Sequence, residues 1–176
     1  MKEFIKNKWK ILVFVLVLLV LSLVIYFVAR RVSFSKKEYK GTYYKVVYDD
    51  SWKSKVSDGN LTLTHKKSKG TIEFHYKLLD NNLIDTNLED IISDILTSLN
   101  EQNKDFKMIS KVYNNEKYDS FQVLYEDDKD QCMINIYKQD NVLIIISYNN
   151  SNDYFDIVLD SVDSILDSIE IYSGER

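Results

Sequence analysis

The sequence has no proline, four glycines, one cysteine and two histidines among its 176 residues. Because Cys132 is the single cysteine, an internal disulfide is excluded and the fold has to be stabilised by its hydrophobic core. We find no phosphate-binding glycine loop, no metalloprotease motif and no nucleophile elbow of the serine hydrolases. These absences argue against an enzyme, and we predict no catalytic residue, no cofactor and no metal.

What the sequence does have is one long apolar segment near its start, Ile11 to Ala29. These nineteen residues carry no charge, and as a helix they would extend about 28 Å, close to the thickness of a bilayer's hydrocarbon core. Phe27 stands where a signal-peptidase site ending at Ala29 would need a small residue. We therefore predict an uncleaved transmembrane anchor, in contact with the lipid bilayer through residues 11–29.

Basic residues on both sides of this segment bear on its orientation. Residues 1–10 hold four lysines and residues 30–40 hold five basic residues, so counting positive charge gives nearly a tie. Since a short lysine-rich N-terminus is seldom translocated, we expect residues 1–10 to be a cytoplasmic tail and residues 30–40 a basic linker. Residues 41–176 would then form a globular domain outside the cytoplasm, in a single-pass membrane protein.

The part of the chain beyond the anchor is strongly acidic. Residues 38–176 contain 15 Lys and Arg against 26 Asp and Glu, a formal charge of −11, whereas the whole chain carries −4. Because binding to a phosphate backbone requires a basic face, we expect no nucleic-acid partner. The charge leaves open a cationic partner, a metal ion or no partner at all.

Hydrophobic periodicity predicts an α+β fold. Alternating and β-branched residues predict strands at 42–48, 61–65 and 72–76, and four more at 107–113, 120–126, 131–138 and 142–148. Helical spacing predicts two amphipathic helices, one from Thr86, which has capping-box spacing to Glu89, to Gln102, and one over 153–169. Short connections favour hairpins, so the order of three strands, a helix, four strands and a helix indicates a largely antiparallel sheet packed with two helices.

Over residues 42–172 the chain resembles the PsbP-like proteins, the family of an extrinsic photosystem II subunit and of many bacterial lipoproteins and anchored proteins. The resemblance rests on Tyr44-Lys45-Val46-Val47-Tyr48 with Trp52 four residues on, on the element order, and on the closing pattern Phe155…Leu159…Val162…Ile165-Leu166-Asp167-Ser168-Ile169. The family often has a proline before the tryptophan, where this chain has Asp49-Asp50-Ser51. The resemblance implies a binding or accessory module without a shared catalytic motif, often extracytoplasmic. We also expect Trp52 to be buried at one end of the core.

The two histidines are too far apart for a shared metal ion in the expected hairpin. If residues 66–69 form its loop, His65 lies opposite Gly70 and His75 lies opposite Asn60. Five residues at about 3.3 Å each then separate the histidines by roughly 16 Å along the ladder, whereas zinc ligands lie about 2 Å from the metal. We expect surface histidines without a ligand role.

Two further features have ordinary structural interpretations. Cys132 alternates with Ile134 and Ile136 on one strand face, which predicts a buried, inert thiol rather than a nucleophile. The acidic run at residues 126–130 lacks the glycine-containing spacing of an EF-hand calcium loop, so we expect a solvated turn.

A row of aspartates on the last helix is the candidate partner-binding surface. Its members recur at spacings of three and four, which places them on one face, away from the apolar face. They are Asp153, Asp156, Asp160, Asp163 and Asp167. Such a row is usually a solvated surface, but it is also suited to steering a cationic protein partner.

Three functional hypotheses remain open. The first is a non-enzymatic, membrane-anchored extracytoplasmic binding or accessory domain of a Gram-positive-type bacterium. The alternative is an immunity-type protein that neutralises a basic secreted toxin at the cell surface, which the aspartate row motivates. The third is a hydrolase with an unrecognised site, and a deep pocket with clustered, perturbed carboxylates would distinguish it.

Overall fold

The computed structural model describes residues 19–22, 35–102, 107–114, 117–126 and 128–172. The chain divides into two units, residues 1–35 and Lys36–Arg176. The expected anchor and the basic tail lie outside the described residues, except for residues 19–22, which are helical. Within the described ranges, no helix has the length and apolar character needed to cross a bilayer.

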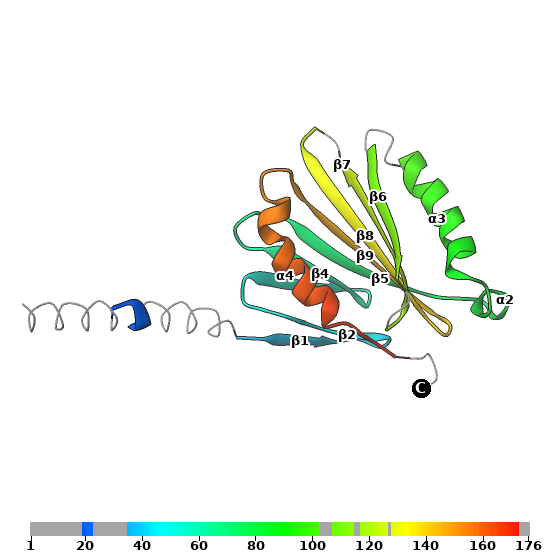
Figure 1. Ribbon diagram of the computed structural model, residues 1–176. Helices are drawn as coiled ribbons and strands as arrows, with labels where there is room; N and C mark the ends of the chain where they lie inside the picture. Colours follow the sequence, from blue (N-terminus) through cyan, green and yellow to red (C-terminus); the bar gives the residue numbers. More distant parts are fainter. Residues whose placement is uncertain (1–18, 23–34, 103–106, 115–116, 127, 173–176) are drawn as a thin grey trace, which may run out of the picture. The chain divides into compact units, whose positions relative to one another are not determined.

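The second unit is an α+β domain (Figure 1). Its strands are β1 (Lys37–Lys40), β2 (Tyr44–Tyr48), β3 (Trp52–Ser57), β4 (Asn60–His65), β5 (Thr71–Leu78), β6 (Lys107–Asn114), β7 (Asp119–Glu126), β8 (Asp130–Gln139), β9 (Val142–Ser151) and β10 (Glu170–Ile171). Its helices are α2 (Asn81–Ile84), α3 (Leu88–Gln102) and α4 (Phe155–Asp167).

The strands form two antiparallel sheets. The larger has the order β3-β4-β5-β9-β8-β7-β6, and the smaller has the order β1-β2-β10. Consecutive strands are joined by hairpins within β3-β4-β5 and within β6-β7-β8-β9, and β5 pairs with β9 to unite the two groups. The expected antiparallel α+β architecture is confirmed, with more strands than the sequence pattern predicts.

Helix α4 and the small sheet cover one face of the large sheet, which we call the α4 face. Alternation along the strands sends side chains such as Leu63, Phe74 and Ile146 to this face, where they pack on the buried side of α4. That side of α4 consists of Phe155, Val158, Val162, Ile165 and Leu166. Trp52 is buried here as expected, and its indole nitrogen donates a hydrogen bond to Ser161 Oγ at 2.9 Å.

Helix α3 covers the opposite face, which we call the α3 face. Phe121, Tyr125 and Ile136 alternate with the residues of the α4 face and pack against Leu88 and Ile92. Along each of β7, β8 and β9, successive residues therefore alternate between the two cores. The two helices pack on opposite faces of one sheet, which the sequence pattern does not specify.

Three boundaries differ from the sequence expectation. Lys37–Lys40 form strand β1, so the folded unit begins before residue 41 and takes in the end of the expected linker. Helix α3 begins at Leu88 rather than Thr86, because Asn87 Oδ1 accepts a hydrogen bond from the Glu89 N–H at 3.1 Å and caps it. Helix α4 begins at Phe155, so Asp153 lies just before it.

Candidate functional site

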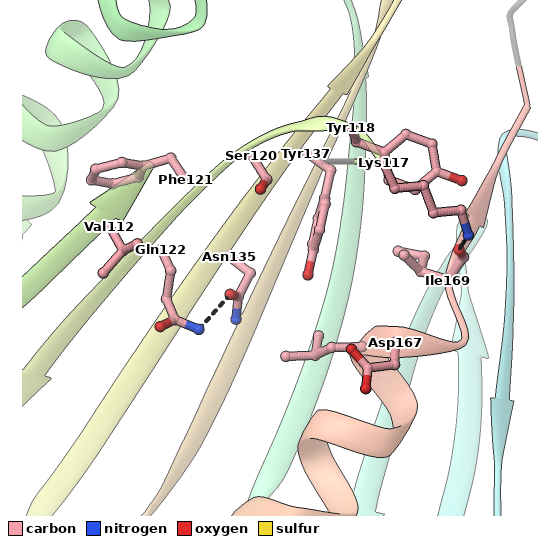
Figure 2. Close-up of a pocket in the computed structure, with 11 residues that line it drawn as sticks. Val112, Lys117, Tyr118, Ser120, Phe121, Gln122, Asn135, Tyr137, Asp167 and Ile169 are labelled. Carbon is pink, nitrogen blue, oxygen red and sulfur yellow. Dashed lines mark hydrogen bonds between the residues drawn. The ribbon is translucent and has the colours of Figure 1, made fainter. Parts of the chain in front are cut away.

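A cleft opens on the α4 face, between the C-terminal end of α4 and the strands β6, β7 and β8. Its volume is about 440 Å³, within the usual range of ligand sites. It is lined by Val112, Lys117, Tyr118, Ser120, Phe121, Gln122, Asn135, Tyr137, Leu166, Asp167 and Ile169 (Figure 2). The strands supply a polar floor, and the end of α4 supplies one wall.

Two amides form the centre of this floor. Gln122 and Asn135 are direct partners across β7 and β8, and Gln122 Nε2 donates to Asn135 Oδ1 at 2.9 Å. Asn135 is only 5% exposed, and its Nδ2 has no hydrogen-bond partner among the described residues. A buried polar group left unpaired costs about 1–3 kcal/mol, so this donor needs an explanation. Two other buried atoms share this condition, Tyr44 Oη and Gln139 Oε1, but neither residue lines the cleft.

Tyr137 stands beside Asn135 on the floor, two residues further along the same face of β8 (Figure 2). Burial raises the pKa of its phenol to about 12, and the negative charges of Asp167 and Asp163 act in the same direction. The phenol therefore stays protonated at neutral pH and can donate a hydrogen bond. Its ring packs edge-on against Tyr118, with 6.3 Å between the centroids.

Contacts with the C-terminal segment hold the rim of the cleft. Lys117 Nζ donates to the carbonyl oxygen of Ile169 at 2.9 Å and lies 5.0 Å from the centroid of the Tyr118 ring. The Tyr118 hydroxyl accepts a hydrogen bond from the Ile171 N–H at 3.2 Å. These contacts tie the segment before β7 to the chain that follows α4, so two segments distant in sequence form one wall.

All five aspartates of the predicted row are exposed; the four from Asp156 onward lie on α4, whereas Asp153 precedes it. The structure joins only the last of them, Asp167, to the cleft lining. The pKa of Asp163 is raised, first by partial burial and then by the charges of Asp167 and Asp160. The C-terminal half of the row is therefore a concentration of negative charge at the edge of the cleft.

The expected hairpin register of the two histidines is confirmed. Strands β4 and β5 pair with Thr64 opposite Thr71, and the His65 N–H donates to the Gly70 carbonyl oxygen at 2.8 Å. His65 packs on Trp52 with 5.1 Å between ring centroids, whereas His75 is half exposed beside Glu73. The structure thus separates the two histidines and gives His65 a packing role.

Cys132 lies partly buried against the α3-face core. Burial raises the pKa of its thiol to about 11, which disfavours the reactive thiolate and agrees with the predicted inert thiol. Of the acidic run at 126–130, Asp127 lies outside the described residues, and Asp128, Lys129 and Asp130 are exposed. In the described ranges, no three His, Cys, Asp or Glu side chains come together closely enough to hold a metal ion.

The floor residues Gln122, Asn135 and Tyr137 were not predicted as a site. A signal for them existed, because the expected hairpin between 120–126 and 131–138 places Gln122 opposite Asn135 on neighbouring strands. Two facing amides in a strand pair rich in apolar residues indicate a polar patch within a buried sheet.

Comparison with solved structures identifies the fold. The chain aligns with cyanobacterial PsbP (CyanoP) from Synechocystis sp. PCC 6803 at a TM-score of 0.63 and 14% identity, covering 78% of this chain and 93% of that chain. It also aligns with PA94 of Pseudomonas aeruginosa, a protein of unknown function and putative regulator, at a TM-score of 0.51 and 11% identity, covering 74% and 93% of the two chains. The fold is PsbP-like, as the sequence resemblance implied. No protein-family model and no curated protein sequence matches the chain.

Proposed function

We propose that this protein is a membrane-anchored, extracytoplasmic binding or accessory domain without catalytic activity, and that the cleft beside α4 is its ligand site. The observation that carries this proposal is the unpaired Nδ2 of Asn135 on the cleft floor. A ligand with a hydrogen-bond acceptor would satisfy this donor, whereas the free protein leaves it buried and unpaired. The apolar segment at residues 11–29 supports the anchor.

The titratable groups around the cleft favour binding over catalysis. A general acid or base works best with a pKa near the operating pH, but the pKa of Tyr137 is about 12. The acidic groups near the cleft, Asp163 and Asp167, lie four residues apart on one helix, at one wall. They cannot flank a substrate bond from opposite sides, as the paired carboxylates of glycoside hydrolases do. This arrangement gives little support to the hydrolase hypothesis.

Photo-crosslinking in membranes of the source bacterium tests the ligand site. Val112 lines the cleft and is 54% exposed, so a benzoylphenylalanine placed there should form an adduct with the ligand. Val56 on β3 is matched in size and exposure at 53%, and it does not line the cleft. We expect a defined mass added at position 112 and not at position 56. Equal labelling at both positions, or no adduct at 112, would contradict the proposal.

Protease treatment tests the location. A protease added to intact cells stripped of their wall should digest residues 38–176, because we place this domain outside the cytoplasm. Protection of the domain until the cells are lysed would overturn that placement.

An immunity-type protein that neutralises a basic secreted toxin is the second candidate. The exposure of the aspartate row favours it, since surface carboxylates steer cationic partners. Replacing Asp156 and Asp160 by lysine should then slow toxin association most at low salt, where the Debye length exceeds about 10 Å. Capture of the toxin that is unchanged by this double substitution would count against the second candidate.

A further inference from the structure

The acidic row and the cleft meet at one residue. Asp160, Asp163 and Asp167 lie on consecutive turns of α4, and Asp167 also lines the cleft. A ligand in the cleft can therefore reach the row without leaving the surface of the protein. The two features that the sequence and the structure indicate separately form one continuous surface.

Among the described residues, no basic side chain forms an ion pair with Asp163 or Asp167. Burial, Asp167 and Asp160 all act to raise the pKa of Asp163. Lys117 is the basic residue in the cleft lining; it keeps its positive charge, but its Nζ is directed to the Ile169 carbonyl oxygen, to which it donates at 2.9 Å. The wall formed by the end of α4 therefore favours a cation in the ligand.

The floor has the opposite preference, because it offers hydrogen-bond donors. Asn135 is 95% buried, and Figure 2 shows its free Nδ2 on the side of the amide that faces the space between the sheet and Asp167. Tyr137 adds a hydroxyl that remains protonated at neutral pH. The complementary ligand carries acceptor oxygens toward the sheet and positive charge toward α4.

We infer that the cleft binds a short peptide segment containing lysine or arginine. A backbone carbonyl oxygen of the peptide accepts from Asn135 Nδ2, and the basic side chain lies against Asp163 and Asp167. This inference rests on the proposed function and specifies the chemistry of the occupant. A cavity of about 440 Å³ holds a few extended residues, whereas a helix about 10 Å across would not enter it.

A peptide accounts for both features better than other ligands do. A neutral saccharide would use the amides and the phenol but would leave the aspartates without a role. A small inorganic cation would use the aspartates but could not accept a hydrogen bond from Asn135 Nδ2. An inorganic anion would be repelled by the row. These occupants are alternative outcomes of the binding experiment.

The binding test uses the full-length protein in detergent micelles with ¹⁵N-labelled asparagine. The probe is the acetylated and amidated peptide Gly-Lys-Gly-Lys-Gly, and the matched control is the same peptide with acetyllysine. We expect the lysine peptide to bind at low salt and to shift the side-chain amide signal of Asn135. Acetylation removes the charge and should weaken binding about tenfold or more. Binding of the acetylated peptide with equal affinity, or an unmoved Asn135 signal, would overturn the inference.

Charge variants separate the local site from the overall field. Asp163→Asn with Asp167→Asn removes the carboxylate that lines the cleft and its neighbour one turn away, and Asp153→Asn with Asp156→Asn removes the same charge at the other end of the row. We expect the first pair to weaken peptide binding about tenfold and the second pair to change it about twofold. Equal weakening by the two pairs would contradict a site at the cleft.

Two donor variants test the floor. Asn135→Leu should reduce peptide affinity about fivefold, the usual effect of losing one hydrogen bond. Tyr137→Phe removes only the hydroxyl and keeps the ring packing, so it tests the same floor if Asn135→Leu fails to fold. If both single variants fold and each binds the lysine peptide with unchanged affinity, the inference is contradicted. If the ligand crosslinked at position 112 carries no positive charge, the inference of a basic peptide is overturned. The proposed binding function would still stand.

Discussion

The two faces of the large sheet are covered in different ways. On the α4 face, helix α4 and the small sheet together bury a cluster rich in aromatic residues, including Tyr44, Trp52 and Phe74. On the α3 face, the cluster is smaller and rests on one long helix, with Leu88 and Ile92 as its buried contacts. The α4 face therefore holds most of the packing that unites the first and last strands of the domain.

Each helix leaves part of its face uncovered, and the two hollows differ in chemistry rather than in size. The groove beside α3 has a volume of about 420 Å³ and is lined mainly by aliphatic side chains such as Leu83, Ile95 and Ile145. The cleft beside α4 is about 440 Å³ and contains Asn135, whose Nδ2 is unpaired. None of the unpaired buried atoms in the described residues belongs to the α3 groove. The two hollows are similar in volume, but only the cleft indicates which chemical group a ligand would need. An unpaired donor calls for an acceptor, whereas an aliphatic wall calls for no particular polar group.

The comparison predicts the largest loss of stability at the α4 face. Trp52→Ala should lower the free energy of unfolding by about 3–5 kcal/mol, because it removes a fully buried indole and leaves a cavity. It also removes the hydrogen bond to Ser161. Denaturant unfolding followed by circular dichroism measures this change. A loss below about 1 kcal/mol would show that this face does not hold the core together.

A matched deletion on the α3 face should have a smaller effect. Ile92 is fully buried, and Ile92→Ala should lower the free energy of unfolding by about 2–4 kcal/mol. Ile157 on α4 is 74% exposed, so Ile157→Ala is the surface control and should change it by less than about 0.5 kcal/mol. Hydrogen exchange should accelerate most in α3 for the Ile92 variant. Acceleration confined to β2–β4 would contradict the assignment of Ile92 to a separate cluster.

A third substitution tests how tightly the polar end of the α4 face is packed. A Cβ added at Gly70 would lie 2.5 Å from side-chain atoms of Asn150, which is 5% exposed. Asn150 is held by hydrogen bonds to Tyr148 Oη at 2.9 Å and Ser68 Oγ at 3.0 Å, so it cannot move away cheaply. Gly70→Ala should cost about 1–3 kcal/mol in thermal or denaturant unfolding. At the control position, Gly41→Ala, the three nearest atoms to the added Cβ all belong to the Tyr39 side chain, the closest at 3.0 Å, and an equal cost there would contradict this account.

The smallest expected effect is a pH dependence at His65. Burial lowers its pKa below the ordinary value of 6.5, and the Ser68 N–H donates to its Nδ1 at 3.2 Å, which requires an unprotonated nitrogen. Because the unfolded chain binds this proton more tightly, the stability contribution is complete above pH 6.5 and is lost as pH falls below it. Urea unfolding measures the free energy of unfolding at pH 7.5 and at pH 5.5. Its decline between these pH values should be smaller for His65→Gln than for the original protein. An identical decline in the two proteins would show that His65 does not contribute to the pH dependence of stability.

The sequence predicts the parts of this fold that depend on local pattern. The hairpin register of β4 and β5 follows from the loop at residues 66–69, and the buried side of α4 follows from helical spacing. Strand β3 was not predicted, because only its first residue, Trp52, is buried and the others show no alternation. Strand β1 was read as linker for a similar reason, since three of its four residues are charged.

The site depends on tertiary placement that periodicity does not encode. The loop between β7 and β8 already places Gln122 opposite Asn135, so the polar pair could be derived from the sequence. An amphipathic helix shows that it covers something, but it does not show which face of a sheet it covers or where it ends over the strands. The cleft is formed where the end of α4, at Asp167, meets the floor supplied by β6, β7 and β8.

The junction between β2 and β10 has a consequence for the order of folding. Lys45 pairs with Glu170, and the Val47 N–H donates to Ser168 Oγ at 2.8 Å across 121 residues of sequence. During synthesis, β2 emerges early, but its partner and the wall of the cleft emerge among the last residues of the domain. Contacts between such distant segments close slowly, because the loop entropy is lost before the pairing compensates. We expect the ribosome-bound chain to remain protease-sensitive until residues 168–171 are free, so that the cleft beside α4 is the last part of the domain to mature.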